Sequence, residues 1–349
     1  IGKGANSVSG NTVLGFSALD ASVSGGENTA IGHNALTALT SGTKNVSVGK
    51  DSMITNTTGS GNIAIGGFCL KLNTTADNNV AVGRSSMNVN TTGANNVAVG
   101  ASSLDANTTA SNNTAIGSSA LSANTTGTNT AVGSIALDAN TTGTANSAFG
   151  RDALGANTTG GSNVAVGQSS LANNTTASNN VAVGNSALLS NTTGHSNTGI
   201  GHEVLKSATG TENTAVGRQS QQLTTGNANA SLGAYSLFSN TSGTLNTAVG
   251  KSALFTNTTG SNNTGCGNFT LGYNTTGSDN TAVGRNALRD NTTANNNTAV
   301  GRSSLELNTT GASNVAVGGL SLDANTTGDK NTALGKSCLG DNTTADNNT

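Results

Sequence analysis

Proline and tryptophan are absent from this chain of 349 residues, and its aromatic residues are only six Phe and two Tyr. Large side chains supply most of the apolar area that a domain buries, so their scarcity excludes an ordinary globular enzyme core. Lys and Arg total 14 and Asp and Glu total 16, which leaves a net charge of −2. We therefore predict no nucleic-acid partner. No apolar run approaches the ~20 residues of a membrane-spanning helix, so we expect no membrane insertion in this segment.

Cysteine is almost as scarce, with three residues at irregular spacing: Cys69, Cys266 and Cys338. Neither a CxxC pair nor a paired Cys/His spacing occurs, so we predict no disulfide framework and no metal site. Each cysteine stands where equivalent segments of the chain have Ala, Ser or Val. We interpret all three as small apolar fillers, with Cys266 in a position that we expect to face the core.

Catalytic constellations are also missing from the sequence. The three histidines, His33, His195 and His202, stand at variable positions, which we interpret as exposed loops rather than metal ligands or catalytic bases. The 48 glycines form neither a GxxxxGK[ST] loop nor a GxGxxG strand-to-helix junction, so they predict no phosphate cradle. We predict that the chain is not an enzyme and that it binds no cofactor.

The residues that are abundant in this chain form a regular repeat. The segment Asn-Val/Thr-Ala-Val/Ile-Gly recurs along the whole chain with a period of about 17 residues, and we call its last residue the marker glycine. Sixteen of the 19 intervals between marker glycines have this full length, and the other three are one residue shorter. The marker glycines are Gly15, Gly32, Gly49, Gly66, Gly83, Gly100, Gly117, Gly133, Gly150, Gly167, Gly184, Gly201, Gly217, Gly233, Gly250, Gly267, Gly284, Gly301, Gly318 and Gly335.

Positions counted from the marker glycine show which side chains the repeat preserves. Position −1 is mostly Val or Ile, and position +4 is Leu in 17 of 20 repeats, with Met53, Met87 and Gln221 as the exceptions. We expect both positions to face a core. Position +3 is small, and positions +7 to +10 read Asn-Thr-Thr-Gly/Ala, which is typical of a turn.

Two short extended segments and two turns in each period predict a β-solenoid. The Val/Thr-Ala-Val stretch alternates in size with period two, as a short strand does, and the period is too short for two helices and a turn. We predict an all-β fold, a parallel β-solenoid or β-roll of about 20 coils that spans residues 1–349 as one repeat array. One coil buries little apolar surface, so we also predict that the coils pack against partner chains in an oligomeric fibre.

The repeat resembles those of two groups of attachment proteins. Asn-Thr-Ala-Val-Gly followed by Ala-Leu and Asn-Thr-Thr-Gly, as at Asn246 to Gly260, is similar to repeats of phage-type tail fibres. Its core also resembles the head repeats of YadA-like trimeric autotransporter adhesins, whose period is shorter. The resemblance implies a left-handed roll and a homotrimer. The opening, from Ile1-Gly2 to Gly15, is closer to the shorter adhesin-type coil.

Both ends of the chain fall inside the repeat pattern, since it begins with Ile1-Gly2 and ends at Thr349, before the next marker glycine. We expect a segment of a longer fibrous protein whose anchor, caps and tip lie outside this sequence, because solenoids need distinct terminal caps.

Charged residues fall mainly at positions +1, +2 and +5 and in the late turn, which we interpret as a solvated face. Examples are Arg84, Arg151, Arg218, Arg285, Arg302, Asp105, Asp138 and Asp323. The Asn-Thr-Thr triplet recurs 15 times and is formally a glycosylation acceptor. In a bacterial or phage protein we interpret it instead as a turn with stacked Asn and Thr ladders, whereas a eukaryotic or large-virus source would favour glycosylation. Threonine rows also suggest ice binding, but adjacent threonines in extended backbone would point to opposite faces.

Five aromatic residues form the one candidate ligand patch, although irregular core filling is an equal interpretation: Tyr235, Phe238, Phe255, Phe269 and Tyr273. Together with the resemblance, the repeat suggests an extracellular fibre, at a cell surface or on a virion tail. We expect the shaft or head of a tail fibre or bacterial adhesin that binds a surface glycan or protein receptor. The alternative is a purely structural extracellular filament or matrix protein, and an ice-binding solenoid is a more distant one.

Overall fold

The computed structural model describes residues 2–349, which contain twenty strands of three residues each and no helix. These residues form two compact units, one ending at Ser178 and the other running from Asn179 to Thr349. Within each unit every strand pairs in parallel with the strand one repeat later, as Ala148 of one strand faces Ala165 of the next. The prediction of an all-β parallel solenoid is confirmed. The prediction of a second extended segment in each period is wrong, because positions +3 and +4 lie in a turn, where the leucine has a positive φ, as Leu288 does at 50°.

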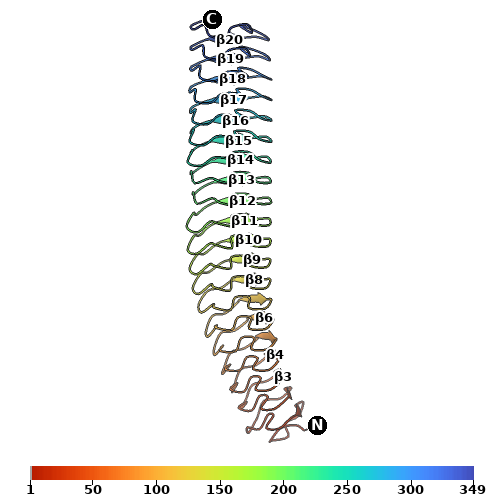
Figure 1. The fold of residues 1–349 in the computed structure, drawn as a ribbon. Coiled ribbons are helices and arrows are strands. Elements are labelled where there is room, and N and C mark those ends of the chain that lie inside the picture. Colours follow the sequence, from red (N-terminus) through yellow and green to blue (C-terminus); the bar gives the residue numbers. More distant parts are fainter. Residues whose placement is uncertain (1) are drawn as a thin grey trace. The chain divides into compact units, whose positions relative to one another are not determined.

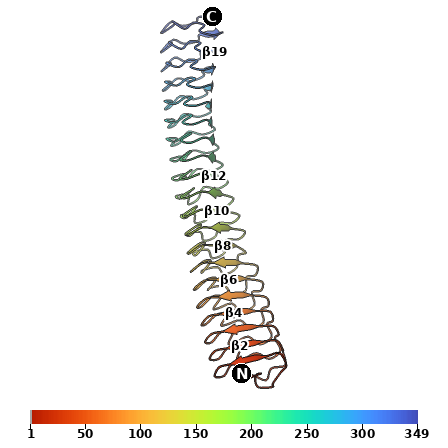
Figure 2. The ribbon, with the colours of Figure 1, turned by 90° about the vertical axis from the view of Figure 1, so that its right-hand side faces the viewer.

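The strands of each unit lie one above another on one side of the stacked coils (Figures 1 and 2). Unit 1 contains β1 (Thr12–Leu14), β2 (Thr29–Ile31), β3 (Val46–Val48), β4 (Ile63–Ile65), β5 (Val80–Val82), β6 (Val97–Val99), β7 (Thr114–Ile116), β8 (Thr130–Val132), β9 (Ser147–Phe149) and β10 (Val164–Val166). Unit 2 contains β11 (Val181–Val183), β12 (Thr198–Ile200), β13 (Thr214–Val216), β14 (Ala230–Leu232), β15 (Thr247–Val249), β16 (Thr264–Cys266), β17 (Thr281–Val283), β18 (Thr298–Val300), β19 (Val315–Val317) and β20 (Thr332–Leu334).

The core of each coil consists of small residues around one leucine. The central residue of every strand, usually Ala, is buried, and so are the residues at positions +3 and +4. In unit 2 this arrangement forms one continuous cluster of Leu and Ala side chains that extends from Leu237 to Ala333. The prediction that the leucine position faces the core is confirmed.

The prediction that position −1 faces the core is wrong. Both ends of each three-residue strand lie outside the buried core, and only the middle residue points inward, because side chains alternate along a strand. The leucines explain why that middle residue is small. A Cβ atom added at Gly199, which occupies the middle position, would lie 2.7 Å from Leu188 and 3.4 Å from Leu205. Around Gly199 the interior is therefore filled, and Val or Ile has room only on the outside. In β1, at the start of the stack, the middle position holds the buried Val13.

The marker glycines let successive coils approach closely. Gly83 has a φ of 136°, and a Cβ atom there would lie 2.4 Å from the carbonyl oxygen of Gly100 in the next coil. Any side chain at this position would push two coils apart. This contact accounts for the glycine at every marker position.

Four residues before each marker glycine stands an asparagine, in every coil from Asn11 to Asn348. Within a unit these residues form a hydrogen-bonded row that we call the inner asparagine ladder. The side-chain oxygen of Asn246 accepts from the backbone N–H of Asn263 at 3.0 Å and from its side-chain amide at 3.2 Å. The amide of Asn263 also donates to the carbonyl of Gly277 at 2.8 Å. Each asparagine thus links three coils.

A second ladder is formed by the asparagines of the Asn-Thr-Thr turns. The buried side chain of Asn257 donates to the side-chain oxygen of Asn240 and to the carbonyl of Gly260, both at 2.9 Å. The prediction of a turn with stacked ladders is confirmed, and burial of the acceptor nitrogen argues against glycosylation of the folded chain. In unit 2 the ladder is interrupted at Ala208 and Thr224, in the two coils that are one residue shorter.

Gln221, the one polar residue in the leucine position, lies in the second of these short coils. Its side chain is fully buried, and its amide donates to Thr214 O, Asn229 O and Ser231 Oγ at 2.9 to 3.3 Å. Its side-chain oxygen has no hydrogen-bond partner. This region of unit 2 therefore has a more polar interior than the coils around it.

The opening of the chain differs from the expectation of a short adhesin-type coil. Gly2 pairs with Val13 in an antiparallel bridge, with both backbone hydrogen bonds at 3.0 Å. Residues 2–13 therefore double back on β1 instead of forming one more parallel coil.

We predict that Asn263→Ala lowers the free energy of unfolding by about 2–4 kcal/mol, because it leaves the buried Asn280 N–H without its acceptor and removes one of the two amides that donate to the Gly277 carbonyl. Urea denaturation followed by circular dichroism measures this change. The matched control is Asn268→Ala, which removes an exposed asparagine from the next repeat and should cost less than about 0.5 kcal/mol. Equal effects of the two substitutions would contradict the structural role of the ladder.

We expect Gln221→Leu to raise the free energy of unfolding by about 1–2 kcal/mol, since it removes an unpaired buried oxygen and restores apolar contact. Two of the three acceptors that lose the Gln221 amide keep other partners, because Asn229 O also accepts from Thr214 N–H and Ser231 Oγ also bonds to Ser220 Oγ. Leucine already adopts this backbone geometry, for Leu205 has the same φ of 48°. The same denaturation experiment applies, with Gln222→Leu as the half-buried neighbouring control. A destabilised Gln221→Leu variant would show that the polar interior is favourable.

Candidate functional surfaces

The structure brings three of the five predicted patch residues together on unit 2. The rings of Tyr235 and Phe238 meet edge to face at 5.9 Å, and Phe238 stacks on Phe255 of the next coil at 5.3 Å. All three rings are half-buried. They form a continuous aromatic cluster across two coils.

Phe269 and Tyr273 form a separate pair, with ring centroids 5.2 Å apart. Phe269 is half-buried and Tyr273 is 47% exposed. Gly272 makes room for the pair, because a Cβ atom there would lie 2.8 Å from the Phe269 ring. None of the ring contacts among residues 2–349 joins Phe255 to this pair.

Positive and negative side chains occupy different positions of the repeat, a separation that the overall charge count does not reveal. Eight of the 14 Lys and Arg residues directly follow a marker glycine, and none of the 16 Asp and Glu residues does. We call these eight side chains the basic row; all are exposed. They are Lys50, Arg84 and Arg151 in unit 1 and Arg218, Lys251, Arg285, Arg302 and Lys336 in unit 2.

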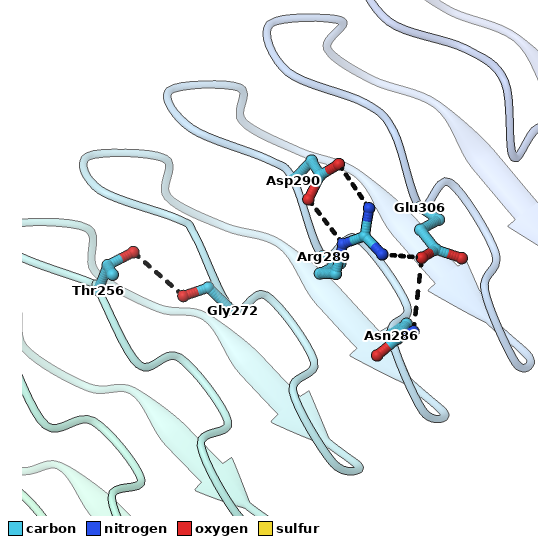
Figure 3. Close-up of polar contacts among 6 residues, drawn as sticks. All are labelled: Thr256, Gly272, Asn286, Arg289, Asp290 and Glu306. Atoms are coloured by element: carbon cyan, nitrogen blue, oxygen red, sulfur yellow. Dashed lines mark hydrogen bonds and ion pairs between the residues drawn. The ribbon is translucent and has the colours of Figure 1, made fainter.

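Carboxylates do not neutralise the basic row. Within residues 2–349 the only Lys and Arg side chains in ion pairs are Lys206 and Arg289, which stand at position +5. Arg289 donates two hydrogen bonds to Asp290, at 2.7 and 2.8 Å, and another to Glu306 (Figure 3). These bonds raise the pKa of Arg289, chiefly through Asp290. The basic row therefore offers unpaired cations to an anionic ligand, whereas Lys206 and Arg289 are already bound to carboxylates.

The prediction of a solvated charged face holds for the arginines of the basic row and only in part for the acids. Asp105, Asp138 and Asp323 are half-buried. Burial raises the pKa of Asp105, and burial together with the charge of Asp152 raises that of Asp138.

Cations of the basic row lie over aromatic rings in both units. In unit 2 the guanidinium of Arg218 lies 5.5 Å from the ring centre of Tyr235, which is in the next coil. In unit 1 the ammonium groups of Lys50 and Lys71 lie 5.8 and 5.6 Å from the ring centre of Phe68. Such contacts hold a cation in place without neutralising it.

A third surface is apolar. The position −1 residues form an outward row on the strand side of each unit, which we call the outer apolar row. Single apolar residues at a surface are normal, but an apolar residue repeated coil after coil is not. Its exposed members are Leu14, Ile65, Ile116, Phe149, Val166, Ile200, Leu232, Cys266, Val283, Val300 and Leu334.

The cysteines occupy three different environments and are all free. Cys69 is a buried filler, as predicted, and burial raises the pKa of its thiol to about 12. Cys338 is half-buried. The prediction for Cys266 is wrong, because this residue belongs to the outer apolar row and is exposed.

The interpretation of the histidines as exposed is confirmed. The side chains of His33 and His202 are 50% and 53% exposed, and His195 is also exposed. Among residues 2–349 no three His, Cys, Asp or Glu side chains come close enough to hold a metal ion. The same residues contain no helix that is long and apolar enough to cross a membrane.

The threonines of the Asn-Thr-Thr turns both lie outside the core. Thr258 is half-buried and donates its hydroxyl to the carbonyl of Thr275 in the next coil at 2.8 Å, while Thr259 is exposed. The triplet bends and is not extended, so the argument that adjacent threonines of an extended backbone point to opposite faces does not apply to it. Ice binding stays an untested alternative.

Sequence comparisons with known proteins identify no relative of this chain. Neither a family model nor a curated protein matches the sequence.

Proposed function

We propose that this chain is a non-enzymatic, extracellular attachment fibre that assembles as a homotrimer. It serves as the shaft or head of a phage-type tail fibre or a bacterial surface adhesin, at a cell surface or on a virion tail. The observation that carries the proposal is the outer apolar row, which leaves Val, Ile, Leu and Phe side chains in contact with water in a single chain. The resemblance of the repeat to tail-fibre and adhesin repeats supports the same function.

The outer apolar row is better explained by a second copy of the chain than by an unrelated partner. The row repeats with the coil spacing along each unit, so a matching partner needs the same spacing over the same length. Another copy of this chain meets that requirement without further assumptions. Closed rotational symmetry places the same coil of each copy at the same height, which lets the rows pack against one another continuously.

Trimeric assembly gives an attachment fibre its mechanical and binding properties. Packed rows stiffen the coils against bending, and three copies of every surface feature face the target together. Weak contacts to a repeated glycan or protein receptor then add up through effective concentration. A purely structural filament is the alternative, and end-to-end polymerisation of the isolated chain would favour it.

We predict that the purified chain sediments as one stable species near three times 33.9 kDa, independent of concentration. The double variant Val283→Lys and Val300→Lys should sediment near 33.9 kDa, because it places charges in the outer apolar row. The matched control, Thr259→Lys with Thr276→Lys, adds the same charges to exposed turn positions and should stay trimeric. A folded wild-type monomer would contradict the proposal.

The rates at which Cys69 and Cys266 react with a thiol reagent, measured in the same samples, show whether the variant is folded and whether the outer apolar row is covered. In the trimer we expect Cys266 to react slowly with a thiol reagent at pH 8, because the outer apolar row is covered. In the charged double variant Cys266 should react quickly, while Cys69 stays slow because its coil remains folded. Fast reaction of Cys266 in a wild-type trimer would show that another face makes the contact.

A further inference from the structure

We infer that the basic row and the aromatic residues of unit 2 form a binding surface for a linear, carboxylated polysaccharide. The inference rests on the proposed attachment function and names the chemical class of its ligand. It combines two observations: exposed cations of one sign along the coils, and an aromatic cluster in which the ring of Tyr235 lies under one of those cations, Arg218.

The spacing of the basic row matches a linear ligand. Coils stack at the strand spacing of about 4.8 Å, so Arg218 and Lys251, two coils apart, are separated by about 10 Å. The five cations from Arg218 to Lys336 span seven coils, or about 34 Å. An extended chain that carries a carboxylate on every second sugar presents charges at comparable intervals along one line. A compact ligand could reach only one or two of these cations.

The cations of this row are free to bind an anion. None of the five forms an ion pair within residues 2–349, and no acid shares their position in the repeat. An approaching carboxylate therefore displaces only water from them. By contrast, Lys206 is 2.7 Å from Glu203, and that ion pair would have to be broken.

The aromatic residues supply the second half of the recognition. Arg218 lies over the ring of Tyr235, so the aromatic cluster adjoins a cation of the basic row. The backbone N–H of Phe269 donates to the carbonyl of Lys251 at 3.0 Å, which places these two residues side by side in neighbouring coils. The ring of Tyr273, which packs against Phe269, is exposed and adds accessible aromatic surface. Aromatic faces stack on the apolar C–H faces of sugar rings while neighbouring cations bind their carboxylates. A sugar polymer with acidic groups satisfies both surfaces at once.

The same pairing of cation and ring recurs outside unit 2. Aromatic residues occupy position +2 three times, as Phe68, Tyr235 and Phe269, and each follows a cation at position +1 of the preceding coil. In unit 1 this places Lys50 over Phe68. The recurrence argues that the pairing is a feature of the repeat and not an accident of one coil.

Nucleic acid fits this surface less well. A DNA duplex carries a charge about every 1.7 Å, so about twenty phosphates would face the roughly 34 Å occupied by five cations. The remaining acids of the chain, which leave a net charge of −2, would repel the excess. A sparsely charged polymer avoids this repulsion.

The experiment measures binding of the full chain to immobilised polygalacturonate and hyaluronate, with neutral dextran and single-stranded DNA as comparison probes. We expect both acidic polysaccharides to bind, and their affinity to fall as salt is raised from low to physiological concentration. Arg218→Gln with Lys251→Gln should weaken binding about tenfold. Tyr273→Ala should weaken it severalfold with little change in salt dependence, because it removes a stacking surface and no charge.

The matched control is Lys206→Gln with Lys330→Gln, which removes two cations of unit 2 that lie outside the basic row. Its binding should change less than about twofold. Equal losses in the two double variants, no binding to either acidic polysaccharide, or tighter binding to dextran or DNA would overturn the inference. Sedimentation of the same samples keeps the two proposals apart, because a trimer that binds no acidic polysaccharide refutes only the ligand class.

Discussion

The inner asparagine ladder is the interaction on which the rest of this structure depends. A typical side chain of the ladder accepts a backbone N–H from the next coil and donates to a carbonyl, at 2.8 to 3.1 Å, as that of Asn263 does. The ladder therefore satisfies polar backbone groups at turns where no strand pairing reaches. A buried polar group without such a partner would cost more than the small apolar core of one coil returns. The asparagine is accordingly present in every coil, whereas the leucine position tolerates Met53, Met87 and Gln221.

The ladders also determine which side chains lie at the surface. Because two asparagines, one leucine and small residues fill the interior of a typical coil, the larger strand residues such as Val283 and Val300 must face outward. Parallel stacking then turns each outward position into a row. One row is apolar and, in the fibre that we propose, packs against copies of the same chain. Another row is basic, and its members Lys50 and Arg218 lie over aromatic rings. The proposed fibre and its proposed ligand thus follow from one repeat geometry.

The period, the Val/Thr-Ala-Val strand and the turn ladders could be predicted from the sequence, because they depend on spacing and on residue types with strong local preferences. The second predicted extended segment is a turn instead, because the leucine at position +4 adopts a positive φ, which its residue type does not favour. The direction of position −1 could not be predicted. Val and Ile usually face a core, and only the contact between the leucines and the middle strand position, seen at Gly199, shows that no room is left inside. Cys266 was misplaced for the same reason. The aromatic patch was found as a cluster in sequence, but its division into two groups depends on ring positions. The basic row was missed because the charges were counted over the chain and not separately by sign at each repeat position.

Hydrogen exchange of asparagine side-chain amides tests the central role of the ladders most directly. In a sample labelled with nitrogen-15 only at asparagine, we expect two populations in the NMR spectrum. Amides of the ladder, such as those of Asn246 and Asn263, should exchange slowly because they are buried and hydrogen-bonded, while exposed ones such as that of Asn268 should exchange quickly. Rapid exchange of all asparagine amides in the folded chain would contradict the account.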